Sequence, residues 1–200
     1  MKFTFSRKFD FPPEIRFSDG SLMNVVNVKT ILGVQISDDL KWKHNTNFIV
    51  NKARGKIWIL RRLLPLSFTH LELFDVYTKE VRSILEYAVP VWHSGLTRRQ
   101  TSEIEGVQKL AFRIILRQHY SGYERACAYF ETESLEKRRQ QLCLNFARKN
   151  MKSDKSFFTF PNNRSNLRRK NQKVNEFRCN TTRFQRSSLP YLASLINAQN

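Results

Sequence analysis

Two adjacent aspartates, Asp38 and Asp39, are the residues of this sequence that most resemble a catalytic metal site. They follow a run rich in β-branched residues, and paired carboxylates at the end of a strand can hold the metal ions of a nucleotidyl transferase. Such an enzyme needs carboxylates from separate strands, however, and no Tyr-x-Asp-Asp or Phe-x-Asp-Asp string occurs. Because Asp and Ser also end strands and cap helices, we expect the pair to mark the corner between a strand and a helix. We predict no metal or other cofactor.

The histidines offer a second route to metal or acid–base chemistry. None has a partner at the spacing of a metal site, which favours surface or capping roles for His44, His70, His93 and His119. His70 and Glu72 match the His-x-Glu pair of an iron dioxygenase, but Glu72 fits better as part of a helix cap. With six glycines and no Walker or G-x-G-x-x-G loop, a phosphate-cradling enzyme is also disfavoured.

The chain carries 35 Lys and Arg residues against 17 Asp and Glu, a net charge of +18. This balance indicates a polyanionic partner, with nucleic acid first and an anionic membrane surface second. A basic protein that adheres to polyanions without a specific role is the alternative.

One predicted helix concentrates this charge. Between His44 and Leu64, apolar residues recur at three- and four-residue spacings, and at about 100° per residue the basic residues fall on the other side. Arginines around an exposed indole suit phosphate contacts and stacking on a base or sugar. The alternative is a solvated face whose arginines cover a tryptophan that packs elsewhere. The predicted nucleic-acid-binding residues are Lys43, Arg54, Trp58, Arg61 and Arg62.

The periodicity of the chain changes from two to 3.6 after Asp39. We expect strands in 1–37, with a hairpin at Asp19 and Gly20 and a third strand in 29–37. Helices are expected over 44–64, 69–88, 98–117 and 123–129, with a last one that is capped by Thr132 and runs to 151. Thr69 and Glu72 form a capping box, and prolines at 65 and 90 close the first two helices.

These elements predict an α+β fold in three parts. Residues 1–40 form a small antiparallel sheet of about three strands, residues 41–152 a mainly α-helical bundle, and residues 153–200 a basic, partly disordered tail. The tail ends in a short apolar segment, 189–198. This segment either docks back onto the bundle or onto sequence outside the chain.

The cysteine count and hydropathy suggest the compartment. Three cysteines without a C-x-x-C pair are typical of reduced thiols; they are Cys127, Cys143 and Cys179. The N-terminus lacks the apolar region of a signal peptide, and no apolar run reaches the roughly 18 residues of a membrane span. We therefore predict an intracellular protein, nuclear or cytoplasmic, that is not secreted and has no membrane partner.

Six strings of the sequence are informative when they are read together, in order. They are KTILGVQISDDLKW at 29–42, NKARGKIWILRRL at 51–63, VYTKEVRSILEYAVPVWHSGL at 76–96, IEGVQKLAFRIIL at 104–116, SLEKRRQQLCLNFARKN at 134–150 and RFQRSSLPYLASLIN at 183–197. In this order they resemble the C-terminal part of the reverse transcriptase of non-LTR (LINE-type, jockey-like) retrotransposons. The strings at 76–96 and 104–116 resemble the family's most recognisable ones, and the resemblance covers nearly the whole chain.

The resemblance implies the last palm strands, the thumb and the post-thumb segment of an RNA-directed DNA polymerase. In that family the catalytic motif precedes the LGV strand, so the Mg²⁺ ligands are absent here and we expect a non-catalytic, truncated part of the polymerase. The implied partner is template–primer nucleic acid, an RNA–DNA hybrid or RNA, together with a missing palm domain or another copy. The chain is then a decayed copy, an incomplete gene product or a domesticated protein.

Two alternatives stay open. The first is a helical protein-interaction remnant of a mobile element, which predicts an exposed apolar patch near Leu189 to Ile196. The second is a functioning polymerase, which predicts primer extension. The block from the LGV strand to Leu63 also resembles a short domain at the N-terminus of an AlkB-type tRNA-modifying dioxygenase. The iron-binding core of that enzyme has no counterpart in this sequence.

Overall fold

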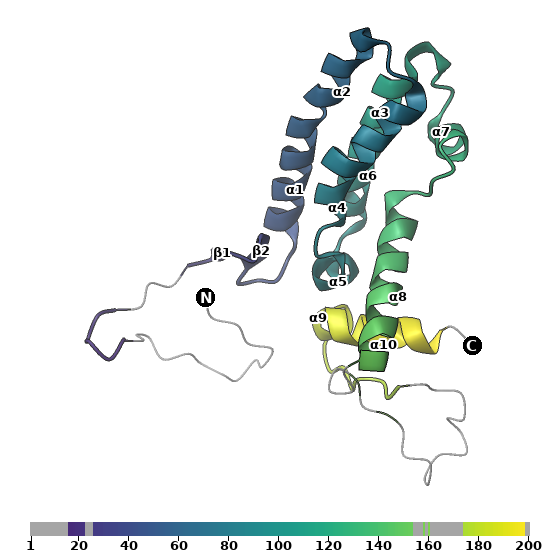
Figure 1. Ribbon diagram of the computed structural model, residues 1–200. Helices are drawn as coiled ribbons and strands as arrows, with labels where there is room; N and C mark the ends of the chain where they lie inside the picture. The colour runs from purple at the N-terminus through teal and green to yellow at the C-terminus, as the bar shows by residue number, and fades with distance from the viewer. Residues whose placement is uncertain (1–15, 23–25, 154–157, 159, 161–173, 199–200) are drawn as a thin grey trace.

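A bundle of helices with a small two-stranded antiparallel sheet at one end makes up the computed structural model, which describes residues 16–22, 26–153, 158, 160 and 174–198 (Figure 1). The α+β class is therefore as predicted. Within these residues no helix has both the length and the apolar character needed to cross a membrane. Residues 154–157, 159, 161–173 and 199–200 of the predicted basic tail, and the first predicted strand, lie outside the described residues.

The sheet is a tight hairpin made by β1 (Val28–Ile31) and β2 (Val34–Ser37). Ile31 pairs with Val34, so the turn consists of Leu32 and Gly33, whose φ values are 48° and 79°. Two positive φ values in a two-residue loop are the geometry that matches the right-handed twist of a hairpin. The prediction of one continuous strand over 29–37 is therefore wrong.

The other predicted strands are less regular than expected. Among the described residues the sheet has two strands, and the segment around Asp19 and Gly20 contributes a turn closed by a single bridge between Arg16 and Leu22. Asp19 accepts hydrogen bonds from the backbone and the side chain of Ser21. The chain thus reverses where predicted, without forming longer paired strands.

Tyr87 fastens the hairpin to the bundle. Its hydroxyl donates a hydrogen bond to the carbonyl oxygen of Leu32 at 2.8 Å. Its ring also lies 3.2 Å from the position that a Cβ would occupy at Gly33. Gly33 is therefore constrained twice, by its positive φ and by the close approach of the ring.

Replacing Gly33 by alanine should destabilise the protein by about 1–2 kcal/mol, because a side chain in the left-handed region costs energy and its Cβ would crowd Tyr87. Gly55→Ala is the matched control, since Gly55 lies in a helix with open space around it. It should stabilise the protein by about 0.5–1 kcal/mol. Urea unfolding monitored by circular dichroism measures both. Equal changes of the same sign would contradict this assignment.

The first helical hairpin follows the predicted order with more breaks. The segment expected as the first helix, 44–64, consists of α1 (Lys43–Lys56), α2 (Trp58–Leu63) and the 3-10 turn η1 (Leu64–Leu66). The segment expected as the second helix, 69–88, consists of α3 (His70–Tyr77), the π-helical turn η2 (Thr78–Arg82) and α4 (Ser83–Glu86). The predicted capping box of Thr69 and Glu72 is confirmed, with both of its hydrogen bonds present.

Pro90 does not end the second helix as predicted. The helix ends at Glu86, and Ala88 adopts a left-handed φ of 51° that redirects the chain. Pro90 instead lies in the first turn of α5 (Val89–Trp92), where its missing N–H is not needed. The 3-10 turn η3 (His93–Gly95) follows.

The remaining helices of the bundle are α6 (Arg98–Leu116), the 3-10 turn η4 (Arg117–His119), α7 (Tyr123–Tyr129) and α8 (Leu135–Ser153). The prediction placed the cap of the last helix at Thr132, which is wrong. Ser134 caps it, because its hydroxyl accepts a hydrogen bond from the backbone of Lys137 at 3.3 Å. Thr132 instead accepts a hydrogen bond from Arg82.

The C-terminal apolar segment docks back onto the bundle. It forms α10 (Ser188–Asn197), preceded by the short α9 (Thr182–Gln185), and α10 crosses the end of α8 (Figure 1). The buried residues of α10 are Pro190, Leu192, Ala193 and Ile196. Ser188 donates a hydrogen bond to the carbonyl of Pro90 at 2.5 Å. The apolar patch that the protein-interaction alternative predicts at 189–196 is therefore largely covered by the chain itself.

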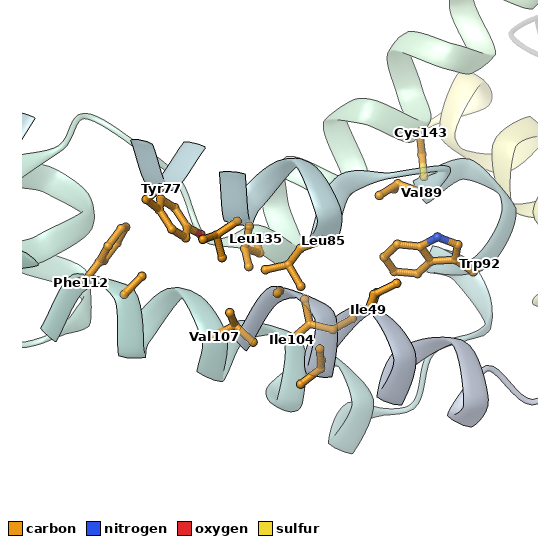
Figure 2. Close-up of a cluster of buried hydrophobic side chains, with 14 of the residues drawn as sticks. Ile49, Tyr77, Leu85, Val89, Trp92, Ile104, Val107, Phe112, Leu135 and Cys143 are labelled. Carbon is orange, nitrogen blue, oxygen red and sulfur yellow. The ribbon is translucent and has the colours of Figure 1, made fainter. Parts of the chain in front are cut away.

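A continuous apolar core joins the helices from end to end (Figure 2). The predicted stripes supply much of it, including Ile49, Leu73, Leu85 and Ile104. Trp92 is fully buried, and its indole N–H donates to the carbonyl of Tyr87 at 3.0 Å. The same tyrosine that holds the hairpin is thereby tied to the core.

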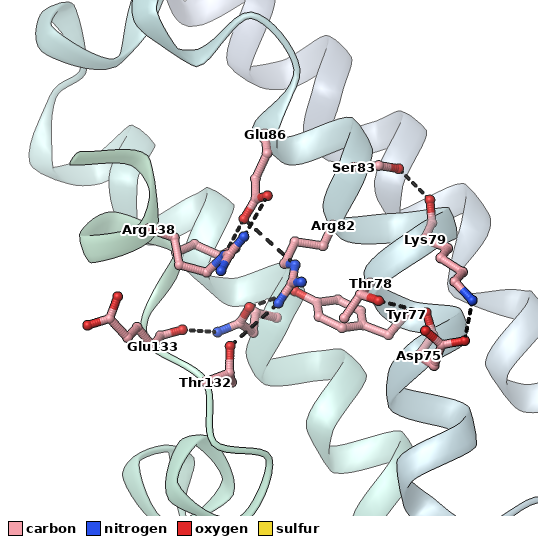
Figure 3. A network of polar contacts seen from close by, with 12 residues as sticks. Asp75, Tyr77, Thr78, Lys79, Arg82, Ser83, Glu86, Thr132, Glu133 and Arg138 are labelled. Carbon is pink, nitrogen blue, oxygen red and sulfur yellow. Dashed lines mark hydrogen bonds and ion pairs between the residues drawn. The ribbon is translucent and has the colours of Figure 1, made fainter. Parts of the chain in front are cut away.

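A partly buried ion pair links the second helix to α8. Arg138 donates to both carboxylate oxygens of Glu86, at 2.5 and 3.0 Å, and Arg82 lies 3.7 Å from the same carboxylate (Figure 3). One acid therefore balances two arginines. Nearby, the buried Gln108 accepts from the hydroxyl of Tyr77 and donates to the hydroxyl of Tyr123.

Candidate nucleic-acid interface

The segment from Lys43 to Leu66 is the most one-sided in charge among the folded elements. It contains six basic residues and no acidic one. Its apolar side is fixed by the core, since Ile49, Ala53, Ile57 and Leu60 are buried. The opposite side of α1 and α2 must then face solvent, and it carries most of the positive charge.

All five predicted binding residues lie on this exposed side. Trp58 is 55% exposed, and the guanidinium of Arg62 lies 5.8 Å from the centre of its ring. The indole therefore packs under an arginine while keeping much of its surface open to solvent. The arginine over the ring fits both interpretations of this face, whereas the exposed surface of the ring is what the binding interpretation requires.

The structure separates the five residues into two groups. The first group lies around the junction of α1 and α2, where the helix is interrupted at Ile57. It consists of Arg54, Trp58, Arg61 and Arg62. Lys43 lies eleven residues before Arg54, about 16 Å away along the helix axis. The full face from Lys43 to Arg62 spans about 28 Å, roughly the rise of eight base pairs. We call it the α1–α2 basic face.

Several cations of this segment are available for a ligand. Lys56 pairs with Glu80 at 3.2 Å, and Lys52 lies over the ring of Phe48. Lys43, Arg54 and Arg61 make no ion pair with any acid in the described ranges. A phosphate at these side chains would replace solvent and would not have to break an existing salt bridge.

A second feature, a cleft of about 640 Å³, opens at the Lys43 end of the face. Its walls come from the turn before α1, the junction between η3 and α6, and the segment from α9 to α10. Sequence reasoning missed this cleft because its walls are distant in the chain and meet only after α10 has docked.

The cleft is positively charged. Of its five basic residues, Arg99 pairs with Glu103 at 2.9 Å and Lys41 pairs with Asp39 at 3.4 Å. The other three are Lys43, Arg183 and Arg186. These three form no ion pair within the part of the chain that the structure describes. The two acids that line the cleft are thus already neutralised.

The aspartates that first suggested metal chemistry form a local turn. Asp39 accepts hydrogen bonds from the hydroxyl of Ser37 at 2.7 Å and from the backbone of Lys41 at 3.0 Å. Partial burial would raise the pKa of Asp39, but these hydrogen bonds outweigh it and lower the pKa. The carboxylate therefore holds the corner between β2 and α1, as the structural interpretation predicts.

The histidines only partly follow the surface role predicted for them. His44 and His119 are exposed, but His93 is buried beside the fully buried Arg139. His70 and His119, distant in sequence, approach with ring centres 5.6 Å apart. Within the described residues no three His, Cys, Asp or Glu side chains gather closely enough to hold a metal ion. Nothing in their spacing revealed the burial of His93.

The thiols are poor candidates for nucleophiles. All three cysteines are free, and Cys143 is fully buried. Burial raises the pKa of Cys143 to about 12 and also raises the pKa of Cys127. Since the thiolate is the reactive form, these two thiols are expected to be inert at neutral pH.

No protein-family model, curated protein or solved structure matches the chain. The LINE-type resemblance therefore stays a prediction that rests on the six sequence strings.

Proposed function

We propose that the chain is a non-catalytic, thumb-like part of a LINE-type RNA-directed DNA polymerase that contacts template–primer nucleic acid through the α1–α2 basic face. The observation that carries this proposal is the face itself. It has six basic residues, no acid, and an exposed indole beside arginines that make no ion pair with the described residues. Phosphates would contact the arginines, and Trp58 would pack on a sugar or an end base.

The absence of catalysis is part of the proposal. The sequence has no Tyr-x-Asp-Asp or Phe-x-Asp-Asp string, and Asp39 is engaged by Ser37 and Lys41. The role is therefore to hold nucleic acid while another domain performs the chemistry. An intracellular location, nuclear or cytoplasmic, follows from this role and is proposed with it.

The protein-interaction alternative loses its main support. Its expected apolar patch at the C-terminus is largely buried against α8 and α5. The basic face, by contrast, is open. The nucleic-acid role is therefore the better-supported of the two.

Charge reversal on the basic face should weaken binding to an RNA–DNA hybrid. We expect the triple variant Arg54→Glu, Arg61→Glu and Arg62→Glu to bind about 100-fold more weakly at about 0.1 M salt, because three phosphate contacts are lost. The measurement is fluorescence anisotropy with a labelled hybrid. All three side chains are exposed, so the fold should persist.

The matched control changes the net charge equally at a distance. Arg117→Glu, Arg125→Glu and Lys137→Glu place the same three reversals on exposed positions of η4, α7 and α8. This control should lose less than about tenfold, through long-range charge alone. Equal losses in both triple variants would show that binding follows net charge and would overturn the assignment of the face.

A further inference from the structure

We infer that the cleft between the start of α1, the start of α6 and the α9–α10 segment binds an unpaired nucleotide, with its base inside and its phosphate at Lys43, Arg183 and Arg186. This inference rests on the proposed function, because it takes a nucleic-acid strand as the ligand that the basic face attracts. It adds a second, distinct contact. The basic face would hold a duplex, whereas the cleft would receive a single nucleoside phosphate.

The size and walls of the cleft fit a small aromatic group. Its volume of about 640 Å³ lies within the range of about 300–1,000 Å³ that is usual for small-molecule pockets. It is a concave site bounded on three sides by elements that are distant in sequence. A duplex requires a broad open surface, whereas a nucleotide that has left its stack fits a concave, half-open site of this kind.

The apolar part of the lining suits a base. Trp42, Leu40 and Val91 contribute side chains to the cleft, and Val91 is 45% exposed. The indole of Trp42 lies so close to Gly95 that a Cβ at this glycine would clash with its ring nitrogen. The absence of a side chain at Gly95 therefore leaves the space that the indole occupies at the cleft wall. Aromatic walls of this type stack on bases without regard to sequence.

The polar part of the lining suits a phosphate. Lys43, Arg183 and Arg186 come from two separate segments of the chain and meet at one cleft. They have no acidic partner among the described residues. An apolar wall next to three uncompensated cations matches the two halves of a nucleoside phosphate.

Lys43 connects this site to the basic face. It is the first residue of α1 and lines the cleft, while Arg54 and Trp58 lie further along the same exposed side. A strand that leaves a duplex held on the α1–α2 basic face would therefore reach the cleft at its Lys43 end. The inferred partner is a duplex with a single-stranded extension.

The intrinsic fluorescence of Trp42 provides a direct test. The full chain has three tryptophans, of which Trp92 is fully buried and Trp58 is exposed. In a Trp58→Phe protein, quenching by added ligand reports Trp42. The ligands are the single strand r(A)8, adenosine monophosphate and inorganic phosphate. We expect saturable quenching by r(A)8, which carries bases to stack on the indole, and none by inorganic phosphate.

Two double variants in the same background complete the test. Arg183→Ser with Arg186→Ser should weaken r(A)8 binding by about tenfold or more, because two phosphate contacts are lost. The control variant, Arg125→Ser with Lys137→Ser, removes the same charge at a distance from the cleft. It should change the affinity for r(A)8 by less than about threefold. Saturable quenching by adenosine monophosphate at similar strength would identify a free nucleotide as the ligand, and quenching by r(A)8 alone would identify a strand.

The inference is overturned if neither r(A)8 nor adenosine monophosphate quenches saturably, or if the two double variants bind r(A)8 equally. Its failure is separable from failure of the proposed function. The α1–α2 charge-reversal variant reports on hybrid binding, and Arg183→Ser with Arg186→Ser reports on the cleft. Loss of hybrid affinity in the first variant with unchanged r(A)8 affinity in the second would leave the basic face in place and exclude the cleft.

Discussion

Acidification from pH 7.5 to pH 4.5 is expected to destabilise the protein by about 2–3 kcal/mol through one residue, His93. Its imidazole is buried beneath α10, where Tyr191 packs edge-on against it at 5.7 Å between ring centres. Burial, and then the neighbouring Arg139 guanidinium, lower the pKa of His93 to about 4. The unfolded chain takes up this proton near pH 6.5.

The direction follows from which state binds the proton first. Between pH 6.5 and pH 4 the unfolded chain is protonated at His93 while the folded protein is not, so stability falls as the pH drops through this range. The geometry agrees, because Arg139 donates its Nε–H to Nδ1 of His93 at 3.3 Å. A protonated imidazole could not accept this hydrogen bond and would place a second cation beside a fully buried arginine.

Urea unfolding of the native protein and of His93→Gln at pH 7.5, 5.5 and 4.5 isolates the effect. Glutamine does not titrate, so the difference between the two proteins removes the contribution of the carboxylates. We expect the native protein to lose about 1 kcal/mol more than the variant by pH 5.5 and about 2–3 kcal/mol more by pH 4.5. Parallel losses in the two proteins would show that His93 is not buried and neutral.

Glu86→Gln should destabilise the protein by about 2–3 kcal/mol, because it leaves two arginines without their shared carboxylate. The side chain of Glu86 is 16% exposed. It accepts two hydrogen bonds from Arg138 and forms an ion pair with Arg82 (Figure 3). Glutamine has nearly the same shape but cannot balance two guanidinium groups. Urea unfolding at pH 7.5 gives the loss directly.

The Asp75–Lys79 pair supplies the control for Glu86. These side chains approach to 2.6 Å but are 56% and 70% exposed, and exposed pairs contribute about 0–1 kcal/mol. Asp75→Asn should therefore change the free energy of unfolding by less than about 0.5 kcal/mol at about 0.15 M salt. If Glu86→Gln costs no more than Asp75→Asn, the contact of Glu86 with two arginines does not stabilise the link between the second helix and α8.

Local signals predicted the helices well. The 3.6-residue period and the Thr69–Glu72 capping box lie within the sequence of the element that they define, and the structure confirms them. The hairpin at Leu32 and Gly33 was missed because two short β-branched runs join into one apparent strand. Leucine at a positive φ is rare, so the turn gave no strong signal.

Contacts between distant residues explain the other differences. The second helix ends at Glu86 and Ala88 redirects the chain, whereas the sequence had suggested Pro90 as the end of the helix. His93 is buried because Arg139 and Tyr191 reach it from α8 and α10. No spacing of residues in the sequence predicts these contacts between distant helices. The exposed basic side of α1 and α2 was predictable because the periodicity of one helix determines it, whereas the cleft depends on the docking of α9 and α10.

The salt dependence of hybrid binding tests the central claim most directly, namely that Arg54, Arg61 and Arg62 contact phosphates. The logarithm of the binding constant falls linearly with the logarithm of salt concentration, by about 0.9 per phosphate neutralised on a duplex. The neutral triple variant Arg54→Gln, Arg61→Gln and Arg62→Gln should therefore have a slope shallower than that of the native protein by about 3. Identical slopes for the two proteins would show that these arginines contact no phosphate and would contradict the proposed role of the α1–α2 basic face.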